Sequence, residues 1–273
     1  MPPVSPAARM WSAVDSLRWS EGVGLGLLQG VVGGVFGIGG SSIGTPLLRM
    51  LLDTPPLVAL GTPLPLTVPS SIAAAAAYRR RGMVNWRAVR WTAPVAAPAA
   101  AAGAVSTRWV PTQLVMMLVA LTLLLAAAQL WRRQWGAQPP QDLFGSSGVS
   151  ARPWVLAFVG VLVGAASGLL ANAGGFLLVP AYVWLLRARV REAAATALCC
   201  APFIALPGIV VHGLLGHIDP SLALQLAIGA VAGSVLGARL SLRFQAIRLR
   251  RPFAVLLLAF GIYFSMRVLN STS

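Results

Sequence analysis

The sequence predicts an all-α integral membrane protein with two inverted repeats, each a glycine-broken, re-entrant helical element followed by three transmembrane helices. Three observations predict this fold class. Hydrophobic residues make up 57% of the 273 residues and charged residues only 10%, which exceeds the apolar content that a water-soluble core uses. The glycine pattern recurs after 134 residues. Finally, the arginines gather on one side of a membrane only if the two copies are inverted.

Several apolar runs have about the length that crosses the hydrocarbon layer, or slightly less. They cover 114–128, 153–171, 193–211, 222–238 and 253–266. The first 20 residues contain Arg9, Asp15 and Arg18 and lack an apolar stretch, so we expect no cleaved signal peptide. The net charge of +15 arises from arginines that lie between apolar runs. Membrane orientation explains that charge, and nucleic acid is not predicted as a partner.

A shift of 134 residues aligns six pairs of glycines without a gap. Chance would give about one such match at this glycine content, so an internal duplication is the better explanation. We therefore divide the chain into an N-terminal segment (1–21), a first repeat unit (22–133), a linker (134–152) and a second repeat unit (153–273). The aligned pairs are Gly26/Gly160, Gly30/Gly164, Gly34/Gly168, Gly40/Gly174, Gly82/Gly216 and Gly103/Gly237.

Each copy is expected to begin with a helix of small residues, 22–36 or 155–170, whose glycines four apart allow another backbone to approach closely. The helix should break at 37–42 or 171–175, because neighbouring glycines favour non-helical backbone. A shorter apolar piece follows, at 43–52 or 176–186. Three further hydrophobic segments complete each copy, at 56–78, 88–107 and 109–131, and again at 193–211, 220–238 and 252–269.

The arginines help to choose between two topologies. If each broken element crosses the membrane once, each copy has four crossings, the copies are parallel, and the two sides carry nearly equal charge. If each broken element returns to its own side, the copies are inverted and almost all of the positive charge falls on one side. Because positive loops stay in the cytoplasm, we prefer the second arrangement, with both termini on the non-cytoplasmic side. Any odd number of crossings per copy would sort the charges equally well.

Inverted repeats with broken helices place a substrate site near the membrane midplane, where irregular backbone lines a cavity. The helical piece after each break starts with free N–H groups and the positive end of its dipole, which suits a small oxoanion or carboxylate. The alternative is that the glycines serve only packing and that the hydroxyls bond their own helices. The candidate substrate-binding residues are Gly37, Gly39, Gly40, Ser41, Ser42, Asn172, Gly174 and Gly175, with Thr62 and Thr196 as a second wall.

Other chemistry is poorly represented in the sequence. No acidic residue lies in the middle of an apolar run, so a buried carboxylate relay is not expected. Cys199 and Cys200 are adjacent, and His212 and His217 are expected to be exposed loop residues, with proton coupling as the alternative. We predict no metal, no cofactor and no catalytic residues, which argues against a membrane enzyme or an assembly subunit. A transporter that works by alternating access is preferred, and a passive small-anion channel stays the alternative.

The run Gly30 to Gly40 followed by Pro46-Leu47-Leu48, with its echo from Gly164 to Gly175 and from Leu177 to Pro180, resembles the TauE/SafE family of sulfite exporters. The resemblance covers about 22–268. It implies a multi-pass inner-membrane permease for sulfite, a sulfonate or another small organosulfur anion, with the lipid bilayer as its surroundings and a homodimer as an open option. Ser41 replaces a third glycine of the family pattern, and Asn172-Ala173 replaces a glycine-rich run, so the substrate stays open.

Overall fold

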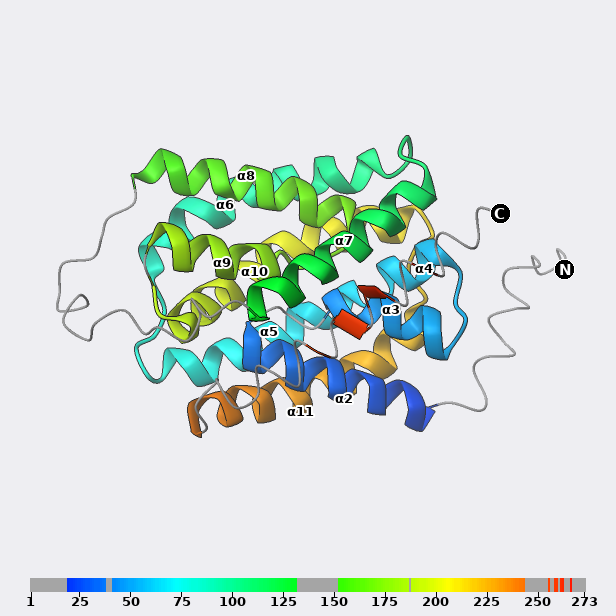
Figure 1. Cartoon of the computed structure of the whole chain (residues 1–273), viewed down its shortest axis with the longest axis horizontal. Coiled ribbons are helices and arrows are strands. Elements are labelled where there is room, and N and C mark those ends of the chain that lie inside the picture. The colour runs from blue at the N-terminus through cyan, green and yellow to red at the C-terminus, as the bar shows by residue number, and fades with distance from the viewer. Residues whose placement is uncertain are drawn as a thin grey trace, which may run out of the picture.

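The computed structural model describes residues 19–37, 41–131, 152–186 and 188–243, together with six positions between 255 and 266. In these residues the chain is all-helical and contains no strand. The helices form one bundle, with most of them lying along its long direction (Figure 1). The all-α fold class predicted from the sequence is therefore confirmed.

The helix order repeats along the chain. The first part contains α2 (Trp19–Phe36), α3 (Ser41–Leu51), α4 (Pro56–Gly61), α5 (Leu64–Arg79), α6 (Trp86–Ser106) and α7 (Thr112–Trp131). The second contains α8 (Pro153–Leu169), α9 (Gly175–Leu185), α10 (Val190–Leu214) and α11 (Pro220–Arg243). The starts of α2, α3, α4 and α6 recur 134 residues later as the starts of α8, α9, α10 and α11. The last predicted segment, 252–269, lies mostly outside the described residues.

The predicted segment 56–78 forms two helices, whereas its counterpart α10 is continuous. The interruption falls at Thr62 and Pro63. Proline has no N–H to donate to the carbonyl four residues earlier, and its ring crowds that carbonyl. Ala197 stands at the corresponding position of α10, so nothing interrupts the helix there.

The outer surface of the bundle is apolar, as a lipid-facing surface must be. Large hydrophobic side chains are exposed along the helices, among them Phe158, Leu162 and Val210. Five exposed tryptophans lie at helix ends or in the turn between α6 and α7, where aromatic residues anchor membrane proteins at the interface. They are Trp19, Trp86, Trp109, Trp154 and Trp184. Three helical stretches are long and apolar enough to cross a bilayer, namely Pro56–Arg79, Arg191–Leu214 and Pro220–Leu242. The chain is a multi-pass membrane protein.

Glycines bring two pairs of helices into backbone contact. Helix α2 lies alongside α11, and α8 lies alongside α6. A Cβ added at Gly26, Gly30 or Gly34 of α2, or at the α8 glycines, would collide with backbone atoms of the facing helix. The register advances four residues at each step, so both pairs run parallel. The facing residues are Gly26/Leu226, Gly30/Ala230 and Gly34/Ser234 in the first pair, and Gly160/Thr92, Gly164/Ala96 and Gly168/Ala100 in the second.

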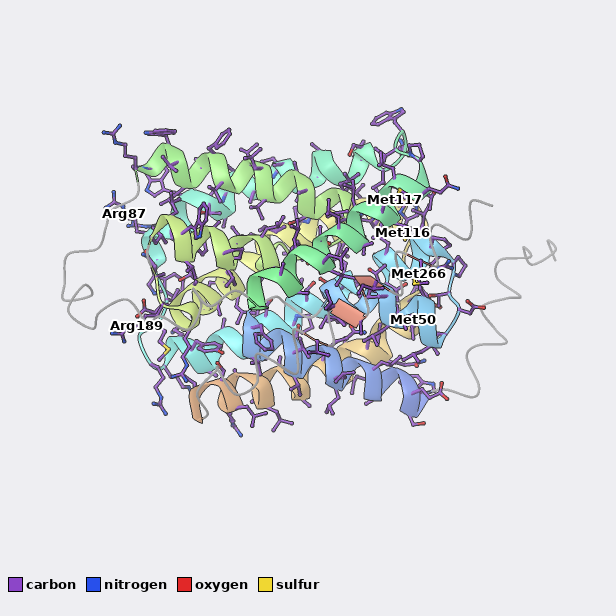
Figure 2. All side chains as sticks on the ribbon, in the orientation of Figure 1. Met50, Arg87, Met116, Met117, Arg189 and Met266 are labelled. Atoms are coloured by element: carbon purple, nitrogen blue, oxygen red, sulfur yellow. The ribbon has the colours of Figure 1, made fainter. Side chains whose placement is uncertain are left out.

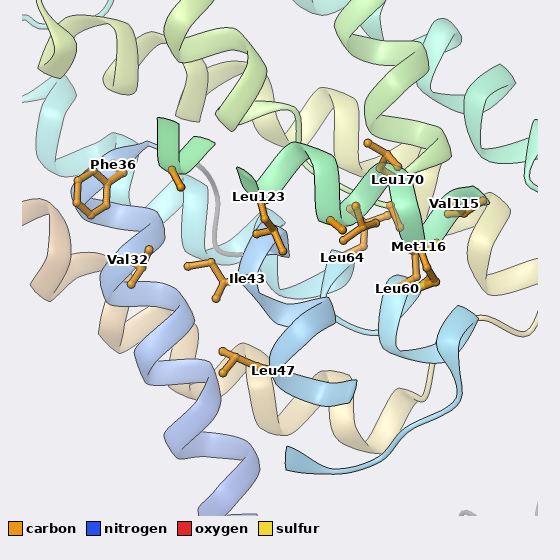
Figure 3. Packing of buried hydrophobic residues seen from close by; sticks show 14 of the residues in the cluster. Val32, Phe36, Ile43, Leu47, Leu60, Leu64, Val115, Met116, Leu123 and Leu170 are labelled. Carbon is orange, nitrogen blue, oxygen red and sulfur yellow. The ribbon is translucent and has the colours of Figure 1, made fainter. Parts of the chain in front are cut away.

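Apolar side chains enclose the short helices α3 and α9. Ile43 and Leu47 of α3 belong to a buried cluster with Val32 and Phe36 of α2, and with residues of α4, α5 and α7 (Figure 3). On the other side, residues of α6, α8, α9 and α10 form a second buried cluster that includes Leu178. Both short helices are therefore packed inside the bundle, and the described residues just before them, Gly37 and 171–174, are buried.

Helices α2 and α8 begin at opposite ends of the bundle, α2 at the right-hand end and α8 at the left-hand end (Figure 1). Arg87 and Arg189 lie together at the left-hand end, whereas Met50, Met116, Met117 and Met266 lie toward the right (Figure 2). Arg79, Arg80 and Arg81 stand where α5 leads into α6, so the left-hand end of the bundle is rich in arginine.

Candidate functional site

The two chain breaks meet inside the bundle. The Ser41 hydroxyl, at the start of α3, donates to Oδ1 of Asn172 at 3.2 Å. The same hydroxyl oxygen accepts from the Ala173 N–H at 3.3 Å. Ser41 is only 2% exposed and Asn172 6%. Residues more than 130 positions apart in the chain therefore form one buried polar contact between the breaks.

Left-handed backbone conformations produce the breaks. Gly37 follows α2 with a φ of +75°, and Gly174 precedes α9 with a φ of +73°. A left-handed residue ends a helix because it turns the chain away from the helical path. Ala171, the counterpart of Gly37, has a φ of +43° although it carries a side chain. The Asn172 N–H closes the end of α8 by donating to the Ser167 carbonyl at 2.8 Å.

The N-termini of α3 and α9 both approach this contact. Helix α3 starts at Ser41 itself, and α9 starts at Gly175, two residues after Ala173. The first N–H groups of a helix have no partner within it, and the dipole places partial positive charge there. Among the described residues the carboxylates of Glu21, Asp53, Glu192 and Asp219 lie at helix ends or in loops. The arrangement can therefore hold a small anion through N–H and hydroxyl donors.

Three of the other predicted residues at the breaks lie in the described part of the chain, and two do not. Gly175, the first residue of α9, is buried. Gly37 is also buried, and a Cβ there would collide with Ala194. Ser42 lies in the first turn of α3. Gly39 and Gly40 lie outside the described residues.

The structure places Thr62 and Thr196 at two matching junctions between the copies. The Thr62 hydroxyl oxygen accepts from the Asp219 N–H, and that of Thr196 accepts from the Asn85 N–H, both at 3.0 Å. Asn85 and Asp219 in turn cap α6 and α11, because their side-chain oxygens accept from N–H groups of the first turn. Each threonine thus joins one copy to a helix start of the other. Their role as a second wall for the substrate stays a prediction.

Two residues hold the ends of α2 and α8: Tyr78, which the sequence did not single out, and His212, whose role here was not predicted. The Tyr78 hydroxyl donates to the Gly34 carbonyl at 2.9 Å. His212 Nε2 lies 2.9 Å from the Gly168 carbonyl, and because a carbonyl can only accept, Nε2 is the donor. Tyr78 and His212 are equivalent under the 134-residue shift, as are Gly34 and Gly168. Because tyrosine and histidine are different residue types, alignment of the two copies by residue identity did not reveal that both side chains bind the end of the preceding helix.

The expectation that both histidines are exposed was wrong for His212, which lies in the last turn of α10 and is fully buried. Its Nδ1 lies 3.0 Å from Nδ1 of His217, in the loop after α10. Burial, and then the charge of His212, lower the pKa of His217 to about 4. In the neutral pair the His217 Nδ1–H donates to His212, since His212 carries its own proton on Nε2.

Comparison with known proteins agrees with a multi-pass membrane protein. The family model described as "Sulfite exporter TauE/SafE" matches residues 22–264. The chain belongs to this family and is a membrane transporter of it.

Curated relatives support the same class. The chain is 28% identical over 244 residues to a "Probable membrane transporter protein" of Xylella fastidiosa (strain 9a5c), covering 88% of this chain and 92% of the relative. It is 23% identical over 254 residues to the "Probable membrane transporter protein YjnA" of Bacillus subtilis (strain 168), covering 87% and 96%. No solved structure matches the chain.

Proposed function

We propose that this transporter moves a small anion, sulfite or an organosulfonate, and binds it where the two breaks meet. The observation that carries the proposal is the buried contact between Ser41 and Asn172 at the N-termini of α3 and α9. Donor groups converge there, and the described carboxylates lie at helix ends or in loops, away from the contact between Ser41 and Asn172 in the chain. The name of the family, sulfite exporter, favours a sulfur oxoanion over other small anions.

The proposed mechanism is alternating access between two inverted halves. Equivalent bonds join the halves in both directions: Thr62 to Asp219 and Thr196 to Asn85. Helix α5 of the first half and α10 of the second contact each other. In this mechanism one half rocks against the other and exposes the breaks first to one side of the membrane and then to the other. The two matching contacts would exchange roles between these two states.

In the proposed orientation the arginine-rich end faces the cytoplasm and both termini lie on the other side of the inner membrane. The exposed ends of α5, α6, α8 and α10 carry Arg80, Arg87, Arg152 and Arg189. Short loops rich in arginine stay on the cytoplasmic side during insertion. The opposite end carries Glu21, Asp53 and Asp219 beside Arg49 and Arg108.

A pair of serine variants tests the site. Ser41→Ala removes the hydroxyl at the break, whereas Ser71→Ala removes a buried hydroxyl that donates to Thr67 and Val68 carbonyls of its own helix. We expect Ser41→Ala to weaken sulfite or sulfonate binding about tenfold, because a hydrogen bond to a charged group is lost. Ser71→Ala should bind like the unmodified protein. Binding is measured by titration of the purified full chain in detergent, after both variants are checked for a cooperative thermal transition.

Equal binding by Ser41→Ala and the unmodified protein would place the anion elsewhere. Flux through liposomes distinguishes a transporter from a channel. A carrier saturates with substrate and is stimulated by unlabelled substrate on the far side, whereas a passive anion channel shows neither behaviour.

A further inference from the structure

A buried glutamine lies unpaired beside the proposed anion site. Gln29 stands in the middle of α2 and is 0% exposed. Neither its Oε1 nor its Nε2 has a hydrogen-bond partner among the described residues. Burying an amide without partners costs folding free energy, and unpaired buried groups of this kind are retained where a ligand uses them.

The Gln29 amide is directed toward α3. Its Oε1 lies 3.1 Å from the position that a Cβ would occupy at Gly44. Gly44 follows Ser41 by three residues in the same helix, so the two lie on one face of α3, about one turn apart. The amide and the contact between the breaks therefore share one side of α3.

A second unpaired group lies near the start of α9. The Ser167 hydroxyl, in α8, is buried with 1% of the residue exposed and has no partner among the described residues. It lies 2.8 Å from the position of a Cβ at Gly174. The Ser167 carbonyl already binds the Asn172 N–H. Each half thus contributes one unused polar side chain, Gln29 beside Gly44 of α3 and Ser167 beside Gly174 at the start of α9.

The two groups differ in chemistry from the helix starts. Backbone N–H groups only donate, and they suit the oxygens of an anion. An amide presents two N–H donors and also a carbonyl oxygen that requires a hydrogen from its partner, whichever way the amide is turned. A bare oxoanion cannot satisfy that oxygen. An anion with its own O–H or N–H group can satisfy both parts of the amide.

We propose that Gln29, with Ser167, is a specificity-determining group that selects sulfur oxoanions or sulfonates bearing a hydrogen-bond donor. The inference rests on the proposed function and names the substrate class for the same site. The oxyanion binds between the starts of α3 and α9. The donor group of the substrate binds Gln29 Oε1, while the Gln29 N–H and the Ser167 hydroxyl contribute to the oxyanion.

Matched ligands and matched variants test this proposal. Isethionate and taurine are ethanesulfonate with an added hydroxyl or ammonium group. We expect the purified full chain to bind both at least about tenfold more tightly than ethanesulfonate, since the analogue leaves the amide unpaired. Gln29→Met, of similar size but without polar atoms, should bind all three ligands alike. Comparison of the affinities for isethionate and taurine shows whether a neutral hydroxyl or a charged ammonium donor is preferred.

Gln225→Met is the control, because Gln225 is also buried but donates to the Ser221 hydroxyl at 3.5 Å. It should keep the preference for isethionate and taurine. Gln29→Met should also have a thermal transition at least as high as the unmodified protein, because an unpaired amide is removed. If Gln29 had only a structural role, its substitution would not change ligand selectivity in a variant whose stability is unchanged. If Gln29→Met does not fold, Gln29→Leu replaces it with the same expectation.

The outcomes separate the two proposals. If the unmodified chain binds none of the sulfonates and no sulfite, the proposed function fails. If it binds ethanesulfonate as tightly as isethionate and taurine, or if the glutamine variant keeps the preference, the role of Gln29 fails while the anion site stands. Ser167→Ala should weaken all three ligands to a similar extent, and unchanged binding would remove Ser167 from the proposal.

Discussion

His217 lies half-buried in the loop between α10 and α11, with its ring centroid 5.3 Å from that of His212. The two rings share a hydrogen bond, and His212 reaches on to the Gly168 carbonyl at the end of α8. Gly168 is followed within a few residues by the second break. The pair therefore links the loop to the helix end that leads into the proposed site.

The lowered pKa of His217 predicts an acid-sensitive fold. The unfolded chain takes up a proton near pH 6.5, whereas the folded chain resists it until about pH 4. The free energy of unfolding should therefore fall as the pH falls from about 6.5 to 4, and change little from this source above pH 7. Thermal transitions in detergent between pH 8 and pH 5 measure the effect. His217→Asn should flatten the profile, and an unchanged slope in that variant would contradict the assignment.

Single residues were predictable from the sequence where the local pattern fixes their place. Ser41 and Asn172 stand at glycine-rich breaks within apolar runs, and such breaks are where polar groups must find partners. Thr62 and Thr196 were found as a repeated pair, but their partners Asp219 and Asn85 lie in the opposite copy. In the sequence, Gln29 stands out as an amide side chain within an apolar helix. Its lack of a partner depends on the surrounding helices and could not be read from the chain.

At the scale of helices, glycines set the distance between α2 and α11. Gly30→Ala would drive a methyl group into the Ala230 backbone, and we expect it to lower the free energy of unfolding by about 2 kcal/mol or more, because two backbones must separate. Gly24→Ala is the matched control, since nothing lies within 4 Å of its added Cβ. Alanine also favours the helix, by up to about 1 kcal/mol. Thermal unfolding compares the two, and equal effects would show that α2 and α11 are not closely packed.

Helix limits followed from the sequence where glycine turns the chain. The predicted breaks coincide with the ends of α2 and α8. The division between α4 and α5 was not predicted, because proline is a poor guide in this chain. Pro69, Pro94 and Pro202 lie inside helices, and neighbouring helices can compensate for the lost hydrogen bond in a membrane. Whether a proline interrupts a helix therefore depends on its tertiary surroundings.

For the whole molecule, the proposed orientation predicts where two reporters will lie. A reporter fused after Ser273 should give a non-cytoplasmic signal, and one inserted in the linker 134–152 should give a cytoplasmic signal, because the arginine-rich end stays inside. Paired phosphatase and fluorescent-protein fusions in intact cells measure both positions. Signals from the same side at both positions would contradict an odd number of crossings between them.

The parallel pairing of α2 with α11 has a consequence for how the chain is made. Gly30 and the residue it packs against, Ala230, are 200 positions apart. At about 5–20 residues per second, roughly 10–40 s pass between the synthesis of the two. During that interval the glycine face of α2 has only lipid or the insertion machinery beside it. Helix α2 is thus made long before its final neighbour, and release of the chain before α11 leaves it without that neighbour.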